Sequence, residues 1–422
     1  MPELASVTID PLLALGKPFF PSLQELHLTF RISGASALNL IKILARPSLR
    51  LCRLYLNGDD NETARFAAHL AASSPHLEEL IIDHASSSYR EHFPRSENIW
   101  QPLISRSQLW PKLRILKVST ASLPATTVHR LLESTELHEL HLRTSDKYPF
   151  VTPRTKSLSA LRVISVEHLS DHGYRVDKLT RDLAAESMLS LLRSVSSSEL
   201  EKIVLTTEHL TTRGIGSIAV ALSDHVKLRK IEVRVQCHCY ESRSPLVLDF
   251  GDLSPLYRLS LLQSLEIVGP HVNLRNGHVP TFGNAWPDLR TLRFPAKKRT
   301  GERATFSILD FTLFALHCPN LEALTVPFDP SSCPRTAPND LVPHPRRYIA
   351  VDASYAVMHG VKEACRVAAF LRAVFPDCAM RYPYLRGRPL EWDSEYDAAG
   401  QADYDRFDGG LDPAFGFDDD EY

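Results

Sequence analysis

The chain has 422 residues, 44% of them hydrophobic and 23% charged, and its formal net charge is −2 at pH 7. It contains no run of about eighteen apolar residues, so we expect no membrane span. The first twenty residues lack a basic segment followed by a long apolar one, so we expect no secretory signal. The seven cysteines are scattered and odd in number, which favours reduced thiols in the cytoplasm or nucleus.

A short phrase of three spaced apolar residues, close to Leu-x-x-Leu-x-Leu, recurs eleven times along the chain. From Leu23 to Leu321, ten intervals span 298 residues, a mean period of about 30 that is near the top of the range for leucine-rich repeats. The phrases are Leu23-Leu26-Leu28, Leu51-Leu54-Leu56, Leu77-Leu80-Ile82, Leu113-Leu116-Val118, Leu137-Leu140-Leu142, Leu161-Ile164-Val166, Leu200-Ile203-Leu205, Leu228-Ile231-Val233, Leu262-Leu265-Ile267, Leu289-Leu292-Phe294 and Leu321-Leu324-Val326.

Each phrase predicts a short strand with one buried face, because its last two apolar residues alternate with outward positions. Parallel strands need long crossovers, which helices usually supply. Apolar stripes with helical spacing lie between the phrases, at Leu40-Ile41-Leu44, Val128-Leu131-Leu132, Met188-Leu191-Leu192-Val195 and Ile215-Ile218-Ala219-Leu222. The predicted fold is therefore an α/β leucine-rich repeat solenoid, a horseshoe with a parallel concave sheet and irregular helical crossovers.

Prolines and a threonine predict where crossover helices end and begin. Proline cannot extend a helix, so it should end the crossover two residues before the first leucine of a phrase. It stands there at Pro21, Pro75, Pro111, Pro287 and Pro319. Gly214-Ile215-Gly216 is half of a dinucleotide-binding motif, but we expect it to open a crossover helix after Thr211 or Thr212.

The phrases FPSLQELHL, SPHLEELII, WPKLRILKV, WPDLRTLRF and CPNLEALTV resemble irregular leucine-rich repeats of the ribonuclease-inhibitor-like superfamily. They are most similar to the F-box-associated repeat proteins of mushroom-forming fungi. The ending VKEACRVAAFLRAVFPDCAMRY is similar to the closing helix and short strand of those proteins. The resemblance spans roughly residues 19–385, and it implies a substrate receptor of F-box-type ubiquitin ligases.

Two departures limit that implication. The Asn or Cys that commonly follows each strand is replaced by Arg31, Asp59, Ala85, Ala121 and Ser145. An F-box needs about forty residues, whereas the first repeat begins by Phe20, so we expect none within this chain.

We expect three segments: an N-terminal cap at 1–19, the solenoid at 20–385 and an acidic disordered tail at 386–422. Within the solenoid, long intervals predict insertions at about 84–108, 168–186, 237–256 and 297–306, and a Pro-rich stretch runs from Pro327 to Pro345. Tyr348–Val351 predicts a degenerate twelfth strand. Val361–Val374 predicts a closing amphipathic helix with Cys365, Ala368, Ala369 and Leu371 on or near its buried side.

The tail changes composition abruptly from Glu391 onward. Residues 391–422 carry twelve acidic residues against Arg406 alone, a net charge of −11, so the other 390 residues carry +9. Such a composition favours disorder. Aromatic residues among the acids are compatible with a short acidic binding segment that folds back on basic loops. A solubilising tail is the simpler alternative.

No enzyme motif is present, and we expect no catalytic residues, cofactor or metal. Cys237-His238-Cys239 is a compact group of metal-type ligands, but it lacks the Cys-x-x-Cys pairs of structural zinc sites, and a loop is the simpler interpretation. Lys297-Lys298-Arg299 and Arg303 are basic residues of a predicted insertion. They could form a weak nuclear import signal or a phosphate contact, but a solvated loop is the simpler alternative.

The outward strand residues are the candidate partner-binding surface, since a solenoid presents its strands on the concave side. The candidates are Glu25, His27, Arg53, Tyr55, Glu79, Lys117, Glu139, His141, Lys202, Lys230, Glu232 and Arg293. Their mixed charge favours a protein or peptide over nucleic acid, which needs a continuous basic stripe. We therefore predict a monomeric, non-enzymatic recognition scaffold. The alternative is an enzyme inhibitor of ribonuclease-inhibitor type, which calls for a strongly acidic face.

Overall fold

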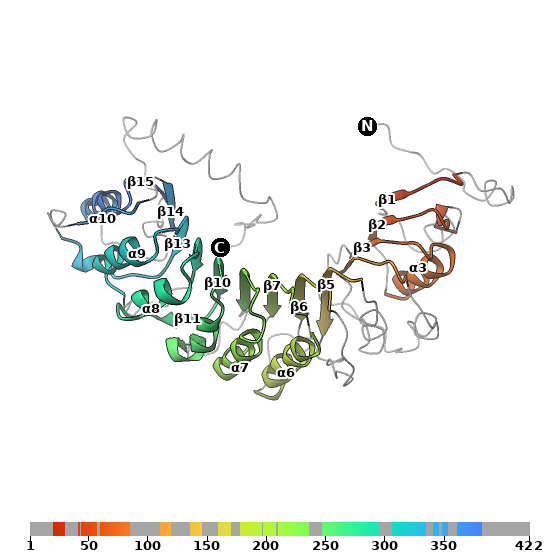
Figure 1. The fold of residues 1–422 in the computed structure, drawn as a ribbon, viewed down its shortest axis with the longest axis horizontal. Coiled ribbons are helices and arrows are strands. Elements are labelled where there is room, and N and C mark those ends of the chain that lie inside the picture. Colours follow the sequence, from red (N-terminus) through yellow and green to blue (C-terminus); the bar gives the residue numbers. More distant parts are fainter. Residues whose placement is uncertain are drawn as a thin grey trace.

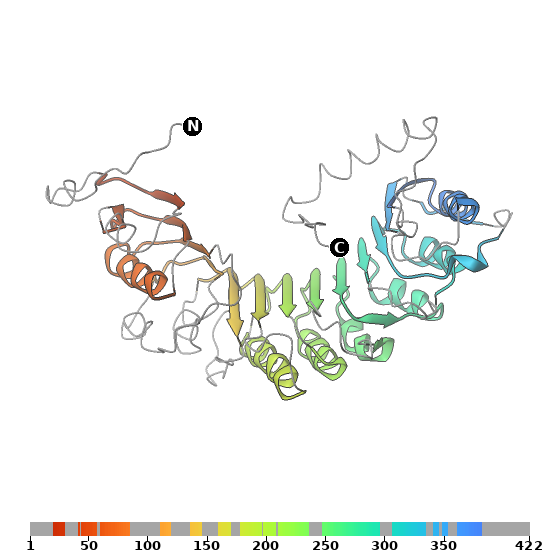
Figure 2. The same cartoon turned by 180° about the vertical axis from the view of Figure 1, so that it is seen from behind.

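The computed structural model describes residues 20–29, 41–42, 44–56, 60–84, 110–119, 136–145, 159–169, 178–195, 197–207, 210–235, 247–295, 306–334, 341–345, 348–352 and 361–381. These residues form a broad arc with the strands along its inner side and the helices along its outer side (Figures 1 and 2). The inner, concave side is therefore lined by strand residues.

Thirteen strands of the described residues form one parallel sheet, whose strands lie in the order in which they occur along the chain. In sheet order they are β1 (Glu25–Thr29), β2 (Leu51–Leu56), β3 (Glu79–His84), β4 (Ile115–Val118), β5 (Glu139–Ser145), β6 (Val163–Leu169), β7 (Lys202–Thr207), β8 (Lys230–Val235), β10 (Ser264–Val268), β12 (Thr291–Arg293), β13 (Ala323–Thr325), β14 (Tyr348–Asp352) and β15 (Asp377–Arg381). All eleven predicted strands are confirmed, and so is the twelfth, β14.

Helices on the outer side return the chain from one strand to the next. In the described residues the α-helices are α3 (Asp60–Ser73), α6 (Lys178–Ser194), α7 (Thr212–Leu222), α8 (His278–Ala285), α9 (Phe311–His317) and α10 (Val361–Val374). The same part of the chain contains the 3₁₀ helices η2 (Phe250–Arg258), η3 (Ile308–Asp310) and η4 (Pro330–Ser332). The mixture confirms the predicted α/β solenoid with irregular crossovers.

Successive repeats enter the sheet through the same pair of backbone hydrogen bonds. The Gln24 carbonyl accepts the N–H groups of Arg50 and Leu51 at 2.8 and 3.0 Å. The Arg50 carbonyl accepts those of Glu78 and Glu79 at 2.7 and 2.9 Å. The pattern recurs at later strands, and it sets a constant register because each repeat is placed by the carbonyl of the repeat before it.

The predicted phase of the second repeat is wrong by two residues. Leu26 pairs with Cys52 and Leu28 with Leu54, so the buried positions of this repeat are Leu49, Cys52 and Leu54. The leucine pattern instead predicts Leu51, Leu54 and Leu56 at these positions. Cysteine packs as a small apolar residue here, which hides the correct phase from a leucine-based pattern. A shift of two residues keeps every side chain on the same face, so Arg53 and Tyr55 still point outward.

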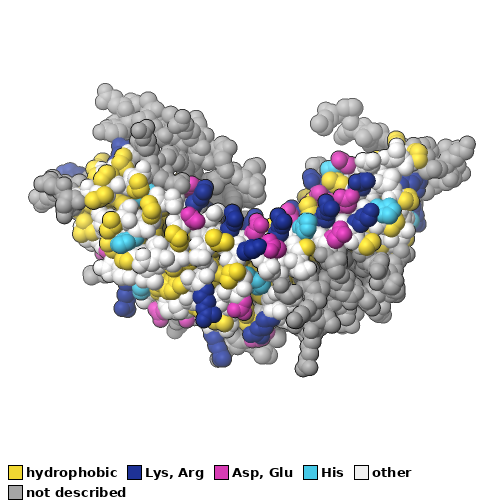
Figure 3. Space-filling view, viewed as in Figure 1, with side chains coloured by type: hydrophobic (Ala, Val, Ile, Leu, Met, Phe, Trp, Pro, Cys, Tyr) yellow, Lys and Arg dark blue, Asp and Glu magenta, His cyan; other side chains and the backbone are white. Residues whose placement is uncertain are grey.

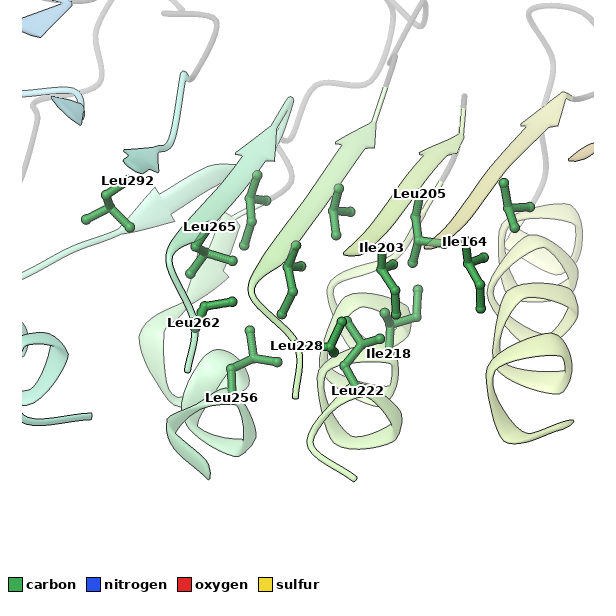
Figure 4. Close-up of a cluster of buried hydrophobic side chains, with 14 of the residues drawn as sticks. Ile164, Ile203, Leu205, Ile218, Leu222, Leu228, Leu256, Leu262, Leu265 and Leu292 are labelled. Atoms are coloured by element: carbon green, nitrogen blue, oxygen red, sulfur yellow. The ribbon is translucent and has the colours of Figure 1, made fainter. Parts of the chain in front are cut away.

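The core lies between the sheet and the outer helices. Ile218 and Leu222 of α7 lie below Ile203, Leu205 and the strands beside them (Figure 4). The predicted stripes of α6 and α7 are fully buried, which confirms their role in packing. Burial of one such aliphatic side chain contributes about 1.5–3 kcal/mol.

The predicted helix boundaries are confirmed where the structure describes them. Thr211 is the N-cap of α7, and its hydroxyl accepts a hydrogen bond from the Gly214 N–H at 3.0 Å. The helices α3, α8 and α9 each end two residues before Pro75, Pro287 and Pro319, respectively. The glycines near Thr211 therefore serve a helix start within the solenoid.

Two predicted insertions are partly regular structure. Helix α6 already begins at Lys178, inside the interval assigned to an insertion at 168–186. In the 237–256 interval, β9 (Val247–Asp249) leads into η2 and pairs in parallel with β11 (His271–Asn273) in a separate small sheet. Gly269 makes the turn from β10 to β11, with a φ of 106° and no room for a Cβ beside the Val235 carbonyl.

The closing helix α10 spans the predicted residues, but its predicted buried side is partly wrong. Cys365 and Ala369 are exposed, whereas Ala368 and Leu371 are buried as expected. The buried face also contains Ala364, Val367, Phe370 and Val374. Helical periodicity allows both phases from sequence, and packing against the last strands selects one.

Several predictions fall outside the described residues. These concern the cap at 1–19, the stripe at Val128, the Cys237-His238-Cys239 group, the basic segment Lys297–Arg303 and the acidic tail. The five cysteines of the described ranges are free thiols, four of them buried. None of the helices in those ranges combines the length and apolar character needed to cross a membrane.

Candidate functional site: the concave face

Parallel pairing aligns the outward side chains of the strands into rows across the concave face. The first row contains Glu25, Leu51, Glu79, Ile115, Glu139, Val163, Lys202, Lys230, Ser264 and Thr291. The second row contains His27, Arg53, Ile81, Lys117, His141, Ser165, Val204, Glu232, Glu266 and Arg293. All twelve predicted partner-binding residues lie in these two rows or, for Tyr55, in a third row beyond them.

Ion pairs tie neighbouring strands together along these rows. Arg53 contacts Glu79 at 2.9 Å, joining β2 to β3. Lys117 lies 3.5 Å from Glu139, joining β4 to β5. Figure 3 shows charged side chains of both signs alternating along the concave side of the arc. Each exposed pair contributes at most about 1 kcal/mol, so the pairs define a charge pattern more than they stabilise the fold.

Two acidic side chains lie almost buried where β8 meets β10. Glu232 is 5% exposed and Glu266 is 8% exposed, and the two are paired in register. Glu232 lies 3.6 Å from Lys230 and forms an ion pair with Arg234, while Glu266 lies 3.7 Å from Arg293. Glu232 is a predicted partner-binding residue, but it is too buried to contact a partner over much of its surface. It instead positions Lys230 and Arg234.

The N-terminal strands carry the most accessible candidates. Tyr55 is 44% exposed, a large apolar surface on a sheet face that also presents the paired Arg53. Glu25 and His27 are exposed side chains of β1, with Glu25 Oε2 and His27 Nε2 4.0 Å apart. This end of the concave face thus combines an aromatic residue with an oriented guanidinium, the residue types that dominate interface energetics.

His141 lies in the middle of the concave face between two lysines. Burial, reinforced by Lys117 and Lys202 and opposed by Glu139, lowers its pKa from 6.5 to about 4. Its Nε2 atom is 3.6 Å from Glu139, beyond hydrogen-bond length, and has no hydrogen-bond partner. His141 is therefore neutral at pH 7, and the positive charge of this region comes from the lysines.

The lowered pKa of His141 predicts that the folded state loses stability on acidification. Between about pH 6.5 and pH 4, His141 is protonated in the unfolded chain but remains neutral in the folded protein. The free energy of unfolding therefore decreases as pH falls through this window. Urea unfolding at pH 7 and pH 5 should show a smaller pH effect in His141→Gln than in the unchanged protein. An equal effect in both proteins would assign the pH dependence to other groups, such as His225, whose pKa burial also lowers.

Some members of the concave face were not among the sequence candidates. Arg143 donates to Glu167 at 2.8 Å between β5 and β6, and Arg234 contacts Glu232. Arg143, Glu167 and Arg234 occupy the third row, one position beyond the last leucine-type residue of the phrase. Extending the alternation of each strand by one step would have found them.

The curved parallel sheet, built from a recurring leucine phrase and backed by crossover helices, defines the protein as a leucine-rich repeat solenoid. The sequence matches no protein-family model and no curated protein. Among solved structures, an internalin from Listeria monocytogenes str. 4b F2365 is similar with 16% sequence identity and a TM-score of 0.33, over 65% of this chain and 69% of the internalin chain.

Proposed function

We propose that the protein is a non-enzymatic recognition scaffold that binds a partner protein on its concave face. The observation that carries this proposal is the pair Tyr55 and Arg53 on the concave face. Tyr55 is an exposed aromatic residue, and Arg53 beside it is held in place by its ion pair with Glu79. Aromatic and arginine side chains provide most of the energy in protein interfaces. The ion pair with Glu79 orients Arg53 in advance and so lowers the entropy lost when a partner binds.

The charge pattern supports a protein partner over nucleic acid. Acidic residues interrupt the cations of the concave rows, so the rows offer no continuous track for phosphates. A strongly acidic face, which the enzyme-inhibitor alternative calls for, is equally absent from the described strands. No three His, Cys, Asp or Glu side chains in the described ranges come together as a metal site.

The finer form of the proposal is a substrate receptor related to F-box-type proteins of ubiquitin ligases, acting in the cytoplasm or nucleus. It rests on the resemblance of the repeat phrases and of the closing helix and strand. Affinity purification from native cells tests it, because cullin-ligase adaptors should copurify with such a receptor. One stoichiometric enzyme in their place would support the inhibitor alternative.

Replacing both Arg53 and Tyr55 by alanine should weaken partner binding by about 2 kcal/mol or more, about thirtyfold, if they form the centre of the interface. The measurement is the amount of copurified partner over a dilution series. Circular dichroism should show an unchanged fold, because both side chains lie on the surface.

The matched control is the double variant Val226→Ala and Lys227→Ala. It also removes one exposed apolar residue and one ion-paired cation, since Val226 is exposed and Lys227 contacts Glu199 at 2.6 Å. These residues lie in the turn before β8 and not in the concave rows. Partner capture that survives the Arg53 and Tyr55 changes, or falls equally in the control, would contradict binding at this end of the concave face.

A further inference from the structure

Lys202 is a cation of the concave rows that lacks an acidic partner. Among the described residues it has no ion pair, whereas Lys117, Lys230, Arg53 and Arg293 all have one. Its neighbour in register on β6 is Val163, and its neighbour on β8 is Lys230. A second lysine, Lys230, therefore lies beside Lys202 at a position where an acidic residue would stabilise the sheet by compensating the charge of Lys202.

The acidic residues of the surrounding strands are already engaged. Glu139 contacts Lys117 and His141, and Glu167 accepts a hydrogen bond from Arg143. Glu232 is held between Lys230 and Arg234. None of these carboxylates is free to turn toward Lys202 without leaving its present partner. The positive charge at this point is thus built into the sheet.

Two further observations mark this position as a binding surface. Like charges directly opposite on neighbouring strands destabilise a sheet, so the Lys202 and Lys230 pair is held against a cost in stability. Lys202 also acts on its surroundings, since its charge helps to lower the pKa of His141. The adjacent outward residues Val163, Ser165 and Val204 are uncharged and half-buried, so they add no competing charge beside Lys202.

We propose that Lys202 and Lys230 form a carboxylate-binding subsite for an acidic segment of the partner protein. Strands in a sheet lie about 4.8 Å apart, so one carboxylate between the two ammonium groups can accept a charge-assisted hydrogen bond from each. The excess charge of +9 in residues 1–390 favours the same ligand over longer distances. This assignment rests on the proposed function and adds the chemistry of the partner.

The test uses the full chain and a fluorescent deca-glutamate peptide as the probe. Binding is measured by fluorescence anisotropy at low and at physiological salt, for the unchanged protein and for Lys202→Met and Lys227→Met. Both variants remove one positive charge, but Lys227 is paired with Glu199 outside the concave rows. We expect Lys202→Met to weaken binding about fivefold or more and Lys227→Met less than twofold, because only Lys202 would contact the probe.

Melting curves separate a lost contact from a damaged fold. Lys202→Met should melt no lower than the unchanged protein, since it removes a repulsion. Absence of probe binding at low salt, or equal weakening by both variants, would overturn the subsite. A tenfold or larger gain in affinity on removing residues 391–422 would assign the subsite to the chain's own acidic tail instead of to a partner.

Failure of this inference is distinguishable from failure of the proposed function. If partner capture is lost with the Arg53 and Tyr55 changes but persists with Lys202→Met, the concave face binds a partner and the acidic-segment assignment is wrong. If neither set of changes affects capture, the partner binds neither at the Arg53 and Tyr55 end nor at Lys202, and both proposals fail.

Discussion

Leu140→Asp is expected to prevent the chain from folding. Leu140 is 0% exposed and pairs in register with Leu116 and Ile164, which are equally buried. An aspartate there would place an unpaired carboxylate between two apolar neighbours, at a cost of several kcal/mol. The position lies in the interior of the sheet, so a neighbouring repeat lies against it on each side.

Expression and circular dichroism measure this effect, and Leu140→Met is its control. Methionine keeps the volume and apolar character of leucine, so it should cost less than about 1.5 kcal/mol. We expect soluble, folded protein from Leu140→Met and aggregated or unfolded protein from Leu140→Asp. Soluble Leu140→Asp with unchanged melting would mean that this side chain does not face the core.

Gly283→Ala and Gly216→Ala should have opposite effects although both glycines lie within helices. A Cβ at Gly283 of α8 would stand 2.1 Å from the His317 carbonyl oxygen of α9, so the two helices must move apart. A Cβ at Gly216 of α7 would meet Asp252 atoms at 3.8 Å, an ordinary contact distance. We expect about 3 kcal/mol of destabilisation at Gly283. At Gly216 we expect stabilisation by about 0.5–1 kcal/mol.

Urea denaturation of the two variants beside the unchanged protein checks this contrast. The transition midpoint should fall for Gly283→Ala and rise slightly for Gly216→Ala. Gly251→Ala is a neutral reference for packing, because a Cβ there meets nothing within 4 Å. Gly283→Ala at or above the midpoint of the unchanged protein would show that α8 and α9 approach less closely than described.

Alternation of apolar residues was sufficient to predict the strands but not every phase. Nine of the eleven phrases have all three predicted residues buried, and the first has Leu26 buried with Leu23 and Leu28 partly buried. The second is displaced because Cys52 occupies the buried position that a leucine pattern assigns to Leu54. The error left the candidate surface intact, since strand side chains alternate with a period of two. In the closing helix the error in phase did change the predicted face, because Cys365 and Ala369 were predicted to be buried and are exposed. A helix offers several overlapping stripes, and only the packed neighbours choose among them.

The sequence predicted which residues line the concave face, but it did not predict which ion pairs they form or how deeply they are buried. Sequence placed Lys202, Lys230 and Glu232 among the outward residues of neighbouring repeats. It could not show that Glu232 is nearly buried and shared by Lys230 and Arg234, because those contacts depend on the register between strands. Nor could it show that Lys202 is left without a partner, since that depends on where every nearby carboxylate is directed.

By itself the sequence determined the solenoid, the order of its strands, the outward face of each strand and the ends of several crossover helices. These properties are local: they follow from alternation, from proline and from capping residues within a single repeat. The tertiary structure decided the register, the second small sheet of β9 and β11, the close approach at Gly283 and the pairing of concave charges. Those properties join residues about one repeat apart, and only the stacking of repeats brings such residues into contact.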